Sequence, residues 1–154
     1  LVITQNIDGL HQQAGSTKVI ELHGNTRAIV CVSCDAEIGF DEAFERVKTE
    51  LPPECTRCGG LLRPRVVFFG ESLPPRALER AAEAVAACDL LLVVGSTLQV
   101  QPASSLPLVA KRSGAHVVIV NVGPTAMDEV ADVFLDGKAG EVLPRIIGQT
   151  TGSR

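Results

Sequence analysis

The chain of 154 residues is long enough for about one globular domain, and its hydrophobic fraction of 45% can supply a substantial core. It carries 14 basic and 18 acidic residues, a net charge of −4, and no basic run longer than Lys111-Arg112, which argues against strong non-specific nucleic-acid binding. The longest apolar run, residues 90–94, is too short to span a bilayer, and nothing in the sequence resembles a signal peptide, so we expect a cytoplasmic protein with reduced thiols.

The first 24 residues are predicted to form two short strands that end in polar side chains. Residues 1–5 are β-branched and apolar, residues 6–9 turn the chain into a short helix, and residues 19–24 form a second extended segment that contains His23. Ligands bind at the carboxyl ends of strands in open α/β sheets, because helix N-termini and backbone amides converge there. The chain opens inside a strand and without Met, so we expect it to be a fragment of a longer protein.

Two Cys-x-x-Cys pairs follow, and they predict a structural zinc site. About 20 residues separate the pairs, which lies in the range of four-thiolate zinc modules. The ligands would be Cys31, Cys34, Cys55 and Cys58. Four thiolates close the coordination shell, so the ion would stabilise the fold and take no part in catalysis. The alternatives are two disulfides or thioredoxin-like redox pairs, but neither pair opens a helix in a βαβ context.

Residues 27–66 are predicted to form this zinc-binding module. It contains a helix over residues 41–48, for which Asp41 is the expected N-cap. We expect Phe40 and Phe44 to pack onto the metal core. A module of this size has too little apolar surface to fold unaided, so the metal would supply the missing stability.

Helix and strand alternate through the remainder of the chain. Pro74-Pro75 opens an amphipathic helix, and the strand at residues 90–94 is apolar on both faces, which predicts a place in the middle of a sheet. The later elements are a helix over 102–112 capped by Gly114, a strand over 116–120, a short helix near 125–130, a strand over 133–135, a helix over 140–147 and a frayed tail over 149–154.

This alternation predicts an α/β fold with right-handed crossovers between parallel strands. The expected architecture is a partial doubly wound parallel sheet, Rossmann-like, with the small zinc-ribbon module inserted in it. Residues 1–26 and 67–148 would form the sheet domain. Polar residues follow three of its strands, at residues 6–8, residues 95–97 and Asn121, and a parallel sheet would bring them to one edge. That edge suits a nucleotide, although the chain contains no Gly-x-Gly-x-x-Gly loop.

Six motifs stand in a fixed order along the chain. They are Thr4-Gln-Asn-Ile-Asp8-Gly9-Leu10-His11, Glu21-Leu-His23-Gly24, the two cysteine pairs, Val67-Phe-Phe-Gly-Glu71, Gly95-Ser-Thr-Leu-Gln-Val-Gln-Pro102 and Val120-Asn121. Their order resembles that of the sirtuins, the NAD-dependent protein lysine deacylases, from residue 1 to about residue 147. The resemblance implies NAD as cofactor and acyl-lysine proteins or peptides as substrates.

The resemblance also implies catalytic roles. In sirtuins the acyl-lysine amide oxygen attacks the anomeric carbon of the nicotinamide ribose, nicotinamide leaves, and a histidine then deprotonates a ribose hydroxyl that attacks the resulting imidate. His23 matches that histidine, and an imidazole titrates near neutral pH, as such a base must. The alternative is a histidine that merely ends a strand. Asn6 and Asp8, the other catalytic candidates, match the positions that hold the carboxamide and a water, although an ordinary Asx turn has the same composition.

The remaining roles are also implied by the resemblance. The residues that match cofactor contacts are Gln5, Asn6, Ile7, Asp8, Gly95, Ser96, Thr97, Asn121, Val122, Gly123 and Ala139. The residues that match substrate contacts are Val67, Phe69, Gly70, Glu71, Leu98 and Val100. Two facing extended edges can clasp a peptide through main-chain hydrogen bonds. For the Val-Phe-Phe run, plain core packing is the alternative.

Sirtuins carry a Gly-Ala-Gly-x-Ser phosphate loop ahead of the stretch with which this chain begins. We therefore expect these 154 residues alone to bind NAD poorly and to turn over little. A non-catalytic zinc-ribbon interaction module is an alternative function, but acidic residues predominate between the cysteine pairs, where such a module would be basic or aromatic. A second alternative function is that of a redox dehydrogenase that binds its cofactor at the predicted sheet edge.

Overall fold

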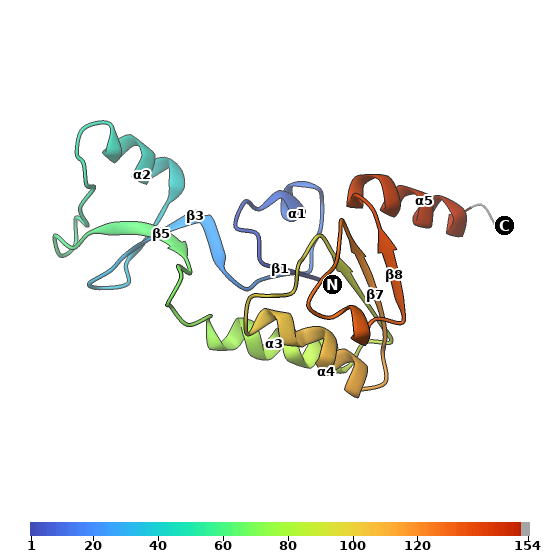
Figure 1. Cartoon of the computed structure of the whole chain (residues 1–154). Helices are drawn as coiled ribbons and strands as arrows, with labels where there is room; N and C mark the ends of the chain where they lie inside the picture. The colour runs from blue at the N-terminus through green and yellow to red at the C-terminus, as the bar shows by residue number, and fades with distance from the viewer. Residues whose placement is uncertain (152–154) are drawn as a thin grey trace. The chain divides into compact units, whose positions relative to one another are not determined.

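The computed structural model describes residues 1–151, and the side chains of residues 1–148. The chain divides into two compact units, Leu1–Leu78 and Glu79–Arg154, and Figure 1 labels most of their elements. The assignment of residues 1–26 and 67–148 to a single domain stays a prediction. Among the described residues, no helix has both the length and the apolar character needed to cross a bilayer.

The first unit begins with two short parallel strands. Strand β1 (Val2–Thr4) pairs with β2 (Val19–Glu21), and the register places Thr4 opposite Glu21. Helix α1 (Leu10–Gln13) lies in the crossover connection that two parallel strands require. Ile20 is buried on β2, so the apolar character of this strand anchors it in the unit.

The zinc-binding module is a three-stranded antiparallel sheet with one helix. Its strands are β3 (Gly24–Cys31), β4 (Glu37–Gly39) and β5 (Leu62–Val66), in the order β4-β3-β5, and its helix is α2 (Phe40–Val47). The buried core of the module consists of Ile29, Cys31, Ala43, Cys55 and Leu62. Two of these five residues are cysteines, so the apolar core depends on the sulfur cluster.

Two predictions for the helix of this module are wrong. Helix α2 starts at Phe40 directly after β4, so Gly39 occupies the N-cap position and Asp41 lies in the first turn. A carboxylate there still favours the helix, because it faces the positive end of the helix dipole. Phe40 and Phe44 stack on each other with ring centroids 5.9 Å apart and stay exposed, since the small Ala43 fills the core position.

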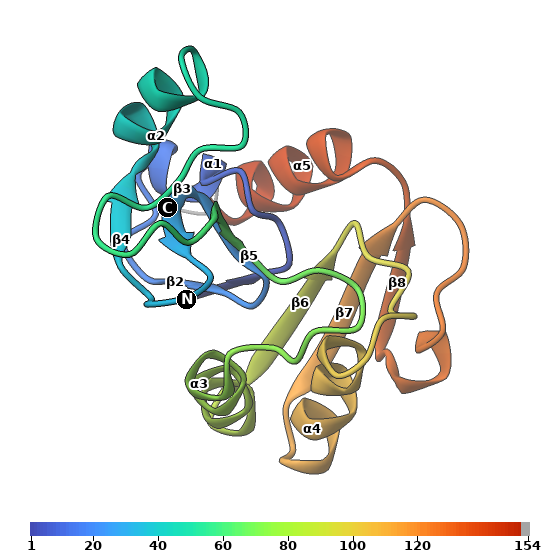
Figure 2. The ribbon, with the colours of Figure 1, turned by 90° about the vertical axis from the view of Figure 1, so that its left-hand side faces the viewer.

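The second unit contains a three-stranded parallel sheet in the order β6-β7-β8 (Figure 2). Its strands are β6 (Leu90–Val94), β7 (His116–Asn121) and β8 (Val133–Asp136), and its helices are α4 (Leu106–Arg112) and α5 (Ala139–Thr151). Helix α3 (Pro75–Ala86) precedes β6 and starts close to the predicted Pro74-Pro75. Helix α4 packs on β6 and β7, and α5 contacts β7.

The prediction that residues 90–94 lie in the middle of the sheet is wrong for the sheet of this unit. Strand β6 is at its edge, and β7 is the central strand. Leu90, Leu92 and Val94 are 57%, 42% and 37% exposed, whereas Val117 and Ile119 on β7 are fully buried. Side chains alternate along a strand, so these three exposed residues form one face of β6. Apolar composition alone did not distinguish an edge strand from a central one.

Helix ends in this unit differ in detail from the prediction. A 3₁₀ turn (Ala103–Ser105) precedes α4, and Gly114 ends α4 as predicted, with φ of +92° and its N–H donating to the Lys111 carbonyl at 3.1 Å. The predicted short helix near residues 125–130 is a 3₁₀ turn (Asp128–Val130). Helix α5 continues to Thr151, so a frayed tail from residue 149 is wrong for residues 149–151, and residues 152–154 lie outside the described residues.

Candidate functional site

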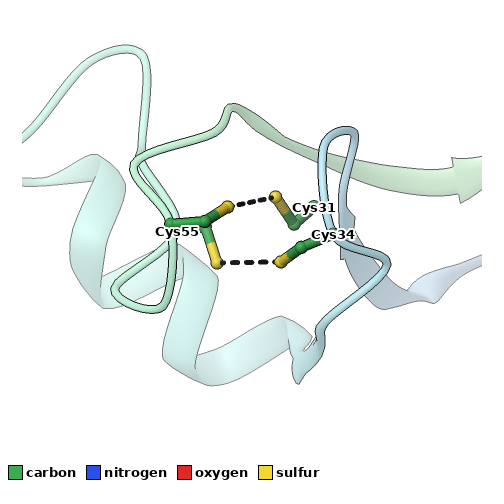
Figure 3. A group of neighbouring side chains, drawn as sticks. Cys31, Cys34 and Cys55 are labelled. Carbon is green, nitrogen blue, oxygen red and sulfur yellow. Dashed lines mark hydrogen bonds between the residues drawn. The ribbon is translucent and has the colours of Figure 1, made fainter.

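The four predicted zinc ligands come together in the first unit. Their sulfur atoms all lie within 4.8 Å of one another. The Sγ atoms of Cys31 and Cys58 are 3.5 Å apart, and those of Cys34 and Cys55 are 3.8 Å apart. Figure 3 shows Cys31 and Cys34 on one loop, facing Cys55 on the other. Each close contact therefore joins one Cys-x-x-Cys knuckle to the other.

Backbone hydrogen bonds shape the two knuckles. The Asp35 N–H donates to the Cys31 carbonyl at 3.1 Å, and the Gly59 N–H donates to the Cys55 carbonyl at 2.7 Å. A Cβ atom on Gly60 would lie 2.9 Å from the Cys31 sulfur, so only glycine allows the second knuckle to approach the first this closely. Gly60 therefore has a specific steric role in the cluster.

The chemistry of the cluster fits a zinc ion. Tetrahedral zinc with bonds of about 2.3 Å to sulfur places its ligand atoms roughly 3.8 Å apart, close to the distances observed. The Ser33 N–H lowers the pKa of Cys31 to about 7. At Cys58 the Gly60 N–H also lowers the pKa. The neighbouring Cys34 and Cys31 raise it by more, so the pKa of Cys58 is about 12. Four thiolates in this space repel one another, and a divalent cation removes that repulsion.

The alternatives for the cysteine pairs do not fit the structure. All four cysteines are free thiols. Cys31 ends β3 and Cys55 lies in the loop before β5, so neither pair opens a helix as a thioredoxin-like motif does. The structure thus favours the structural zinc site over redox chemistry.

His23 lies between β2 and β3, close to the predicted substrate segment. Its carbonyl accepts the Val67 N–H at 3.0 Å. The next residue, Gly24, has φ of +71°, and a Cβ atom there would lie 2.0 Å from the Arg65 carbonyl oxygen, so only glycine lets β3 pair with β5 directly after His23. The His23 Nδ1 atom is buried and, among the described residues, is the one buried side-chain polar atom without a hydrogen-bond partner.

The residue 6–8 turn follows β1 and is held by hydrogen bonds from backbone amides to side-chain oxygens. The Asn6 N–H donates to Thr4 Oγ1 at 3.0 Å, and Asp8 Oδ1 accepts the Leu10 N–H at 3.0 Å. The latter bond is the Asx turn that the composition predicted. It uses one carboxylate oxygen of Asp8, and the side chains of Asn6 and Asp8 are both exposed. An Asx turn and a ligand-binding role are therefore compatible at these positions.

The predicted substrate segment, residues 67–71, forms a closed turn on β5. Glu71 accepts Arg63 NH1 at 2.6 Å and the Phe68 N–H at 3.0 Å, and its own N–H donates to the Phe68 carbonyl at 3.0 Å. The Arg63 guanidinium, followed by the Phe68 N–H, holds the pKa of Glu71 below its ordinary value. Phe69 at the tip is completely exposed, which argues against plain core packing for this run.

In the second unit, predicted cofactor residues gather at the carboxyl ends of the parallel strands. The Gly95 N–H donates to the Val120 carbonyl at 2.9 Å, which joins the turn after β6 to the end of β7. Asn121 is buried, and its Nδ2 donates to the Val122 and Gly123 carbonyls at 3.2 and 3.0 Å. No atom lies within 4 Å of a Cβ placed on Gly95 or Gly123, so the backbone is open to a ligand there.

The other predicted residues of this unit lie near the same edge. Ser96 Oγ accepts the Leu98 N–H at 3.2 Å, the Thr97 carbonyl accepts the Ala126 N–H at 3.0 Å, and Ala139 starts α5 after β8. Leu98 adopts the left-handed conformation with φ of +54°, which is rare outside glycine. Its side chain is buried, whereas Val100 is 45% exposed.

Sequence reasoning missed several residues that hold these turns in place. Thr26 donates its N–H and its hydroxyl to the Ile7 carbonyl, at 3.1 and 3.2 Å, and Asp136 accepts the Gly123 N–H at 3.0 Å. Glu21 and Arg27 form an ion pair beside the residue 6–9 turn. The sequence offered one indication, which is that Glu21 lies two residues before His23 and so on the same face of an extended segment. Two polar residues at this spacing are common in strands.

Comparison with known proteins agrees with this arrangement. The family model described as "Sir2 family" matches residues 1–102, about two thirds of the chain. The chain belongs to the Sir2 family. Its cysteine cluster, His23 and the residue 6–8 turn all lie within the matched residues.

Curated relatives of this Sir2 family chain extend the match. It is 52% identical over 146 residues to "NAD-dependent protein deacylase 2" of Pyrobaculum aerophilum, covering 95% of this chain and 57% of the relative. It is 49% identical over 147 residues to the protein of the same name in Archaeoglobus fulgidus, covering 95% and 58%. The chain thus spans less than two thirds of the length of these relatives.

Solved structures match the fold of this Sir2 family chain. One described as "Sir2-p53 peptide-NAD+" has a TM-score of 0.93 and 43% identity, and the match covers 99% of this chain and 63% of that one. Another, Sir2Tm bound to a propionylated peptide, has a TM-score of 0.94 and 43% identity, with coverage of 99% and 64%. The α/β fold with parallel sheets is therefore that of the family.

Proposed function

We propose that this Sir2 family chain takes part in the NAD-dependent removal of acyl groups from protein lysine side chains. Its relatives carry the names of NAD-dependent protein deacylases, and solved structures similar to it hold acylated peptides and NAD. The observation that carries the proposal is the 3.0 Å hydrogen bond from the Val67 N–H to the His23 carbonyl. It joins the proposed base directly to the segment that would bind the acyl-lysine.

Residues of the first unit would divide the work of the reaction. NAD would supply an ADP-ribose group as the acyl acceptor and nicotinamide as the leaving group. His23, whose Nδ1 has no protein partner, would accept a proton from a sugar hydroxyl through its imidazole. Asn6 and Asp8 would hold the carboxamide. Val67 and Gly70 would offer main-chain groups to the peptide, beside the exposed Phe69.

In the second unit, the open backbone at Gly95 and Gly123 would receive phosphate and sugar groups of NAD. Ser96 and Thr97 add hydroxyl groups at the same strand end, and Asn121 fixes the neighbouring turn. Zinc would hold the module that carries β5 and so support the peptide segment at its end. The reduced thiols that zinc requires suit a cytoplasmic location, which we also propose.

The direct test is to incubate the full-length protein with NAD and an acetyl-lysine peptide and to follow both products. We expect nicotinamide and deacetylated peptide to form in equal amounts and only when both substrates are present. Formation of NADH would instead support a dehydrogenase. Zinc binding without any nicotinamide release in the presence of both substrates would support the non-catalytic interaction module and overturn the proposal.

A further inference from the structure

The Glu21 carboxylate is the centre of a hydrogen-bond network on the first unit. Its Oε1 accepts Gln12 Nε2 at 2.9 Å, its Oε2 accepts Asn25 Nδ2 at 2.9 Å, and Arg27 NH2 donates to both oxygens at 2.7 and 2.9 Å. The Glu21 side chain is only 14% exposed, whereas Arg27 is 45% exposed. The Glu21 carboxylate is therefore covered by three side chains that donate hydrogen bonds to it. Charge-assisted hydrogen bonds of this kind keep the donor side chains in a fixed geometry.

An irregularity in β3 explains how Arg27 reaches this position. The pairing of β3 with β5 shifts register between Asn25 and Ile29. Asn25 Oδ1 accepts the N–H groups of Arg27 and Ala28, at 3.0 and 3.1 Å, and so satisfies amides near the break in pairing. Such a bulge redirects the side chains on the strand. Here it turns Arg27 toward the residue 6–9 turn.

Arg27 packs directly on Gly9. A Cβ atom placed on Gly9 would lie 1.9 Å from Arg27 NH1, so the guanidinium occupies the space that a side chain would take. Gly9 itself is buried and has φ of +73°. Thr26, which precedes Arg27, donates its N–H and its hydroxyl to the Ile7 carbonyl at 3.1 and 3.2 Å. Thr26 and Arg27 thus contact the turn at Ile7 and at Gly9.

We propose that the Glu21–Arg27 pair is a clamp that positions Asn6 and Asp8 for the cofactor. The clamp joins the carboxyl end of β2, two residues before His23, to the turn that would hold the nicotinamide carboxamide. It would thereby keep His23 and the residue 6–8 turn in a fixed relative position. Neither Glu21 nor Arg27 touches a reacting atom in this role. The inference rests on the proposed function, because positioning has a purpose only if the turn binds the cofactor.

Hydrogen exchange tests the clamp without any need for activity. In Arg27→Met, the Leu10 and Thr26 amides, which close the turn, should exchange about tenfold faster than in the wild type. Arg65→Met is the matched control, because Arg65 forms an exposed ion pair with Glu37 at 2.5 Å on the same antiparallel sheet. Arg65→Met should leave the exchange rates of both amides unchanged. Unchanged exchange in Arg27→Met, with zinc content preserved, would overturn the clamp whether or not the protein is a deacylase.

Kinetic measurements on the full-length protein test the positioning role. Arg27→Met should raise the KM for NAD about tenfold while the KM for the acyl peptide stays within about twofold, and Arg27→Lys should recover part of the loss because it keeps a cation beside Glu21. Equal changes in both KM values would show a general loss of structure and overturn the role. A wild-type protein without any deacylation would instead count against the proposed function, and the exchange result would still decide the clamp.

A glycine pair gives a second test that leaves the charges intact. Gly9→Ala would displace the guanidinium, whereas Gly15→Ala, at φ of +93° with no atom within 4 Å of the new Cβ, bears only the backbone strain. Both variants lose stability, but only Gly9→Ala should raise the KM for NAD. Equal KM values in the two variants would contradict the role of the contact between Arg27 and Gly9.

Discussion

The Sγ atoms of Cys31 and Cys58 lie 3.5 Å apart, although 27 positions separate the two residues in sequence. Cys31 ends β3, and Cys58 belongs to the loop that leads into β5, so this contact closes the sheet of the zinc-binding module at one end. The crowding raises the pKa of Cys58 to about 12, because its thiolate would face the sulfurs of Cys34 and Cys31. Metal binding would offset this repulsion and tie the two knuckles together.

Cys58→Ser should therefore remove the metal and unfold the module. We expect zinc affinity to fall by more than about 100-fold and amide protection in β3 and β5 to be lost, while β7 keeps its protection. Zinc content and hydrogen exchange measure both effects. Cys88→Ser is the control, because Cys88 lies outside the cluster and bonds to the Val85 carbonyl. A Cys58→Ser variant with intact zinc and a folded module would contradict the structural role of the site.

In the full-length protein, His23→Ala should lower deacylation by about 10² to 10⁴ fold, the usual range for loss of a general base. Zinc content should not change, because the cysteines remain. The matched control is His116→Ala, since the His116 side chain is 79% exposed and starts a strand in the other unit. Wild-type turnover in His23→Ala would show that another group accepts the proton.

Glu71→Gln should loosen the turn at the tip of the predicted substrate segment. It weakens the bonds to Arg63 and the Phe68 N–H, so the KM for the acyl peptide should rise about fivefold with little change in the KM for NAD. The pKa of Glu71 lies below its ordinary value of 4.5, so peptide binding should lose this contribution only as the pH falls below that value. Glu37→Gln, which breaks the Arg65 ion pair, is the control.

Asp132→Ala should destabilise the second unit at neutral pH. Asp132 accepts the Val117 N–H at 2.8 Å and Lys111 Nζ, and these partners hold its pKa below the ordinary value of 3.8. Because the pKa is lower in the folded state, the stabilisation is complete above about pH 4 and is lost as the pH falls through the folded pKa. We expect Tm to fall by a few degrees at pH 7, and the two proteins to converge in strong acid.

The control for this prediction is Glu141→Ala. Its ion pair with Lys138 is 3.8 Å long, and both side chains are more than 70% exposed, so its loss should change Tm very little at any pH. A difference between Asp132→Ala and the wild type that is the same at pH 7 and in strong acid would show that lost packing, and not the carboxylate charge, is responsible.

The main elements from α3 onward could be predicted because their signals are local. Pro74-Pro75 marks the start of α3 within one residue, and the end of α4 follows from Gly114, whose N–H and positive φ close the helix. Strand β4 was not predicted, since three residues on a small sheet carry no clear alternation. The position of β6 could not be predicted either, because strand order depends on pairing and not on composition.

In the candidate site, too, features with local sequence signals could be predicted and features that depend on strand pairing could not. The cysteine cluster could be predicted because each knuckle is a local structure and the metal dictates how the two must meet. The Glu21–Arg27 pair could not be predicted, because it depends on a register shift between β3 and β5 that turns Arg27 toward Gly9. Phe40 and Phe44 were misplaced for a related reason: large aromatic residues suggest burial, but Ala43 fits the narrow space next to the sulfurs.

We expect strand β6 to affect how the protein behaves at high concentration. Within the described sheet it lies at the edge, and Leu90, Leu92 and Val94 form an apolar row along one of its faces. An edge of this kind can template the addition of strands from other molecules. Storage of concentrated samples should therefore promote aggregation, and a lysine in place of Leu92 should keep the protein soluble for longer.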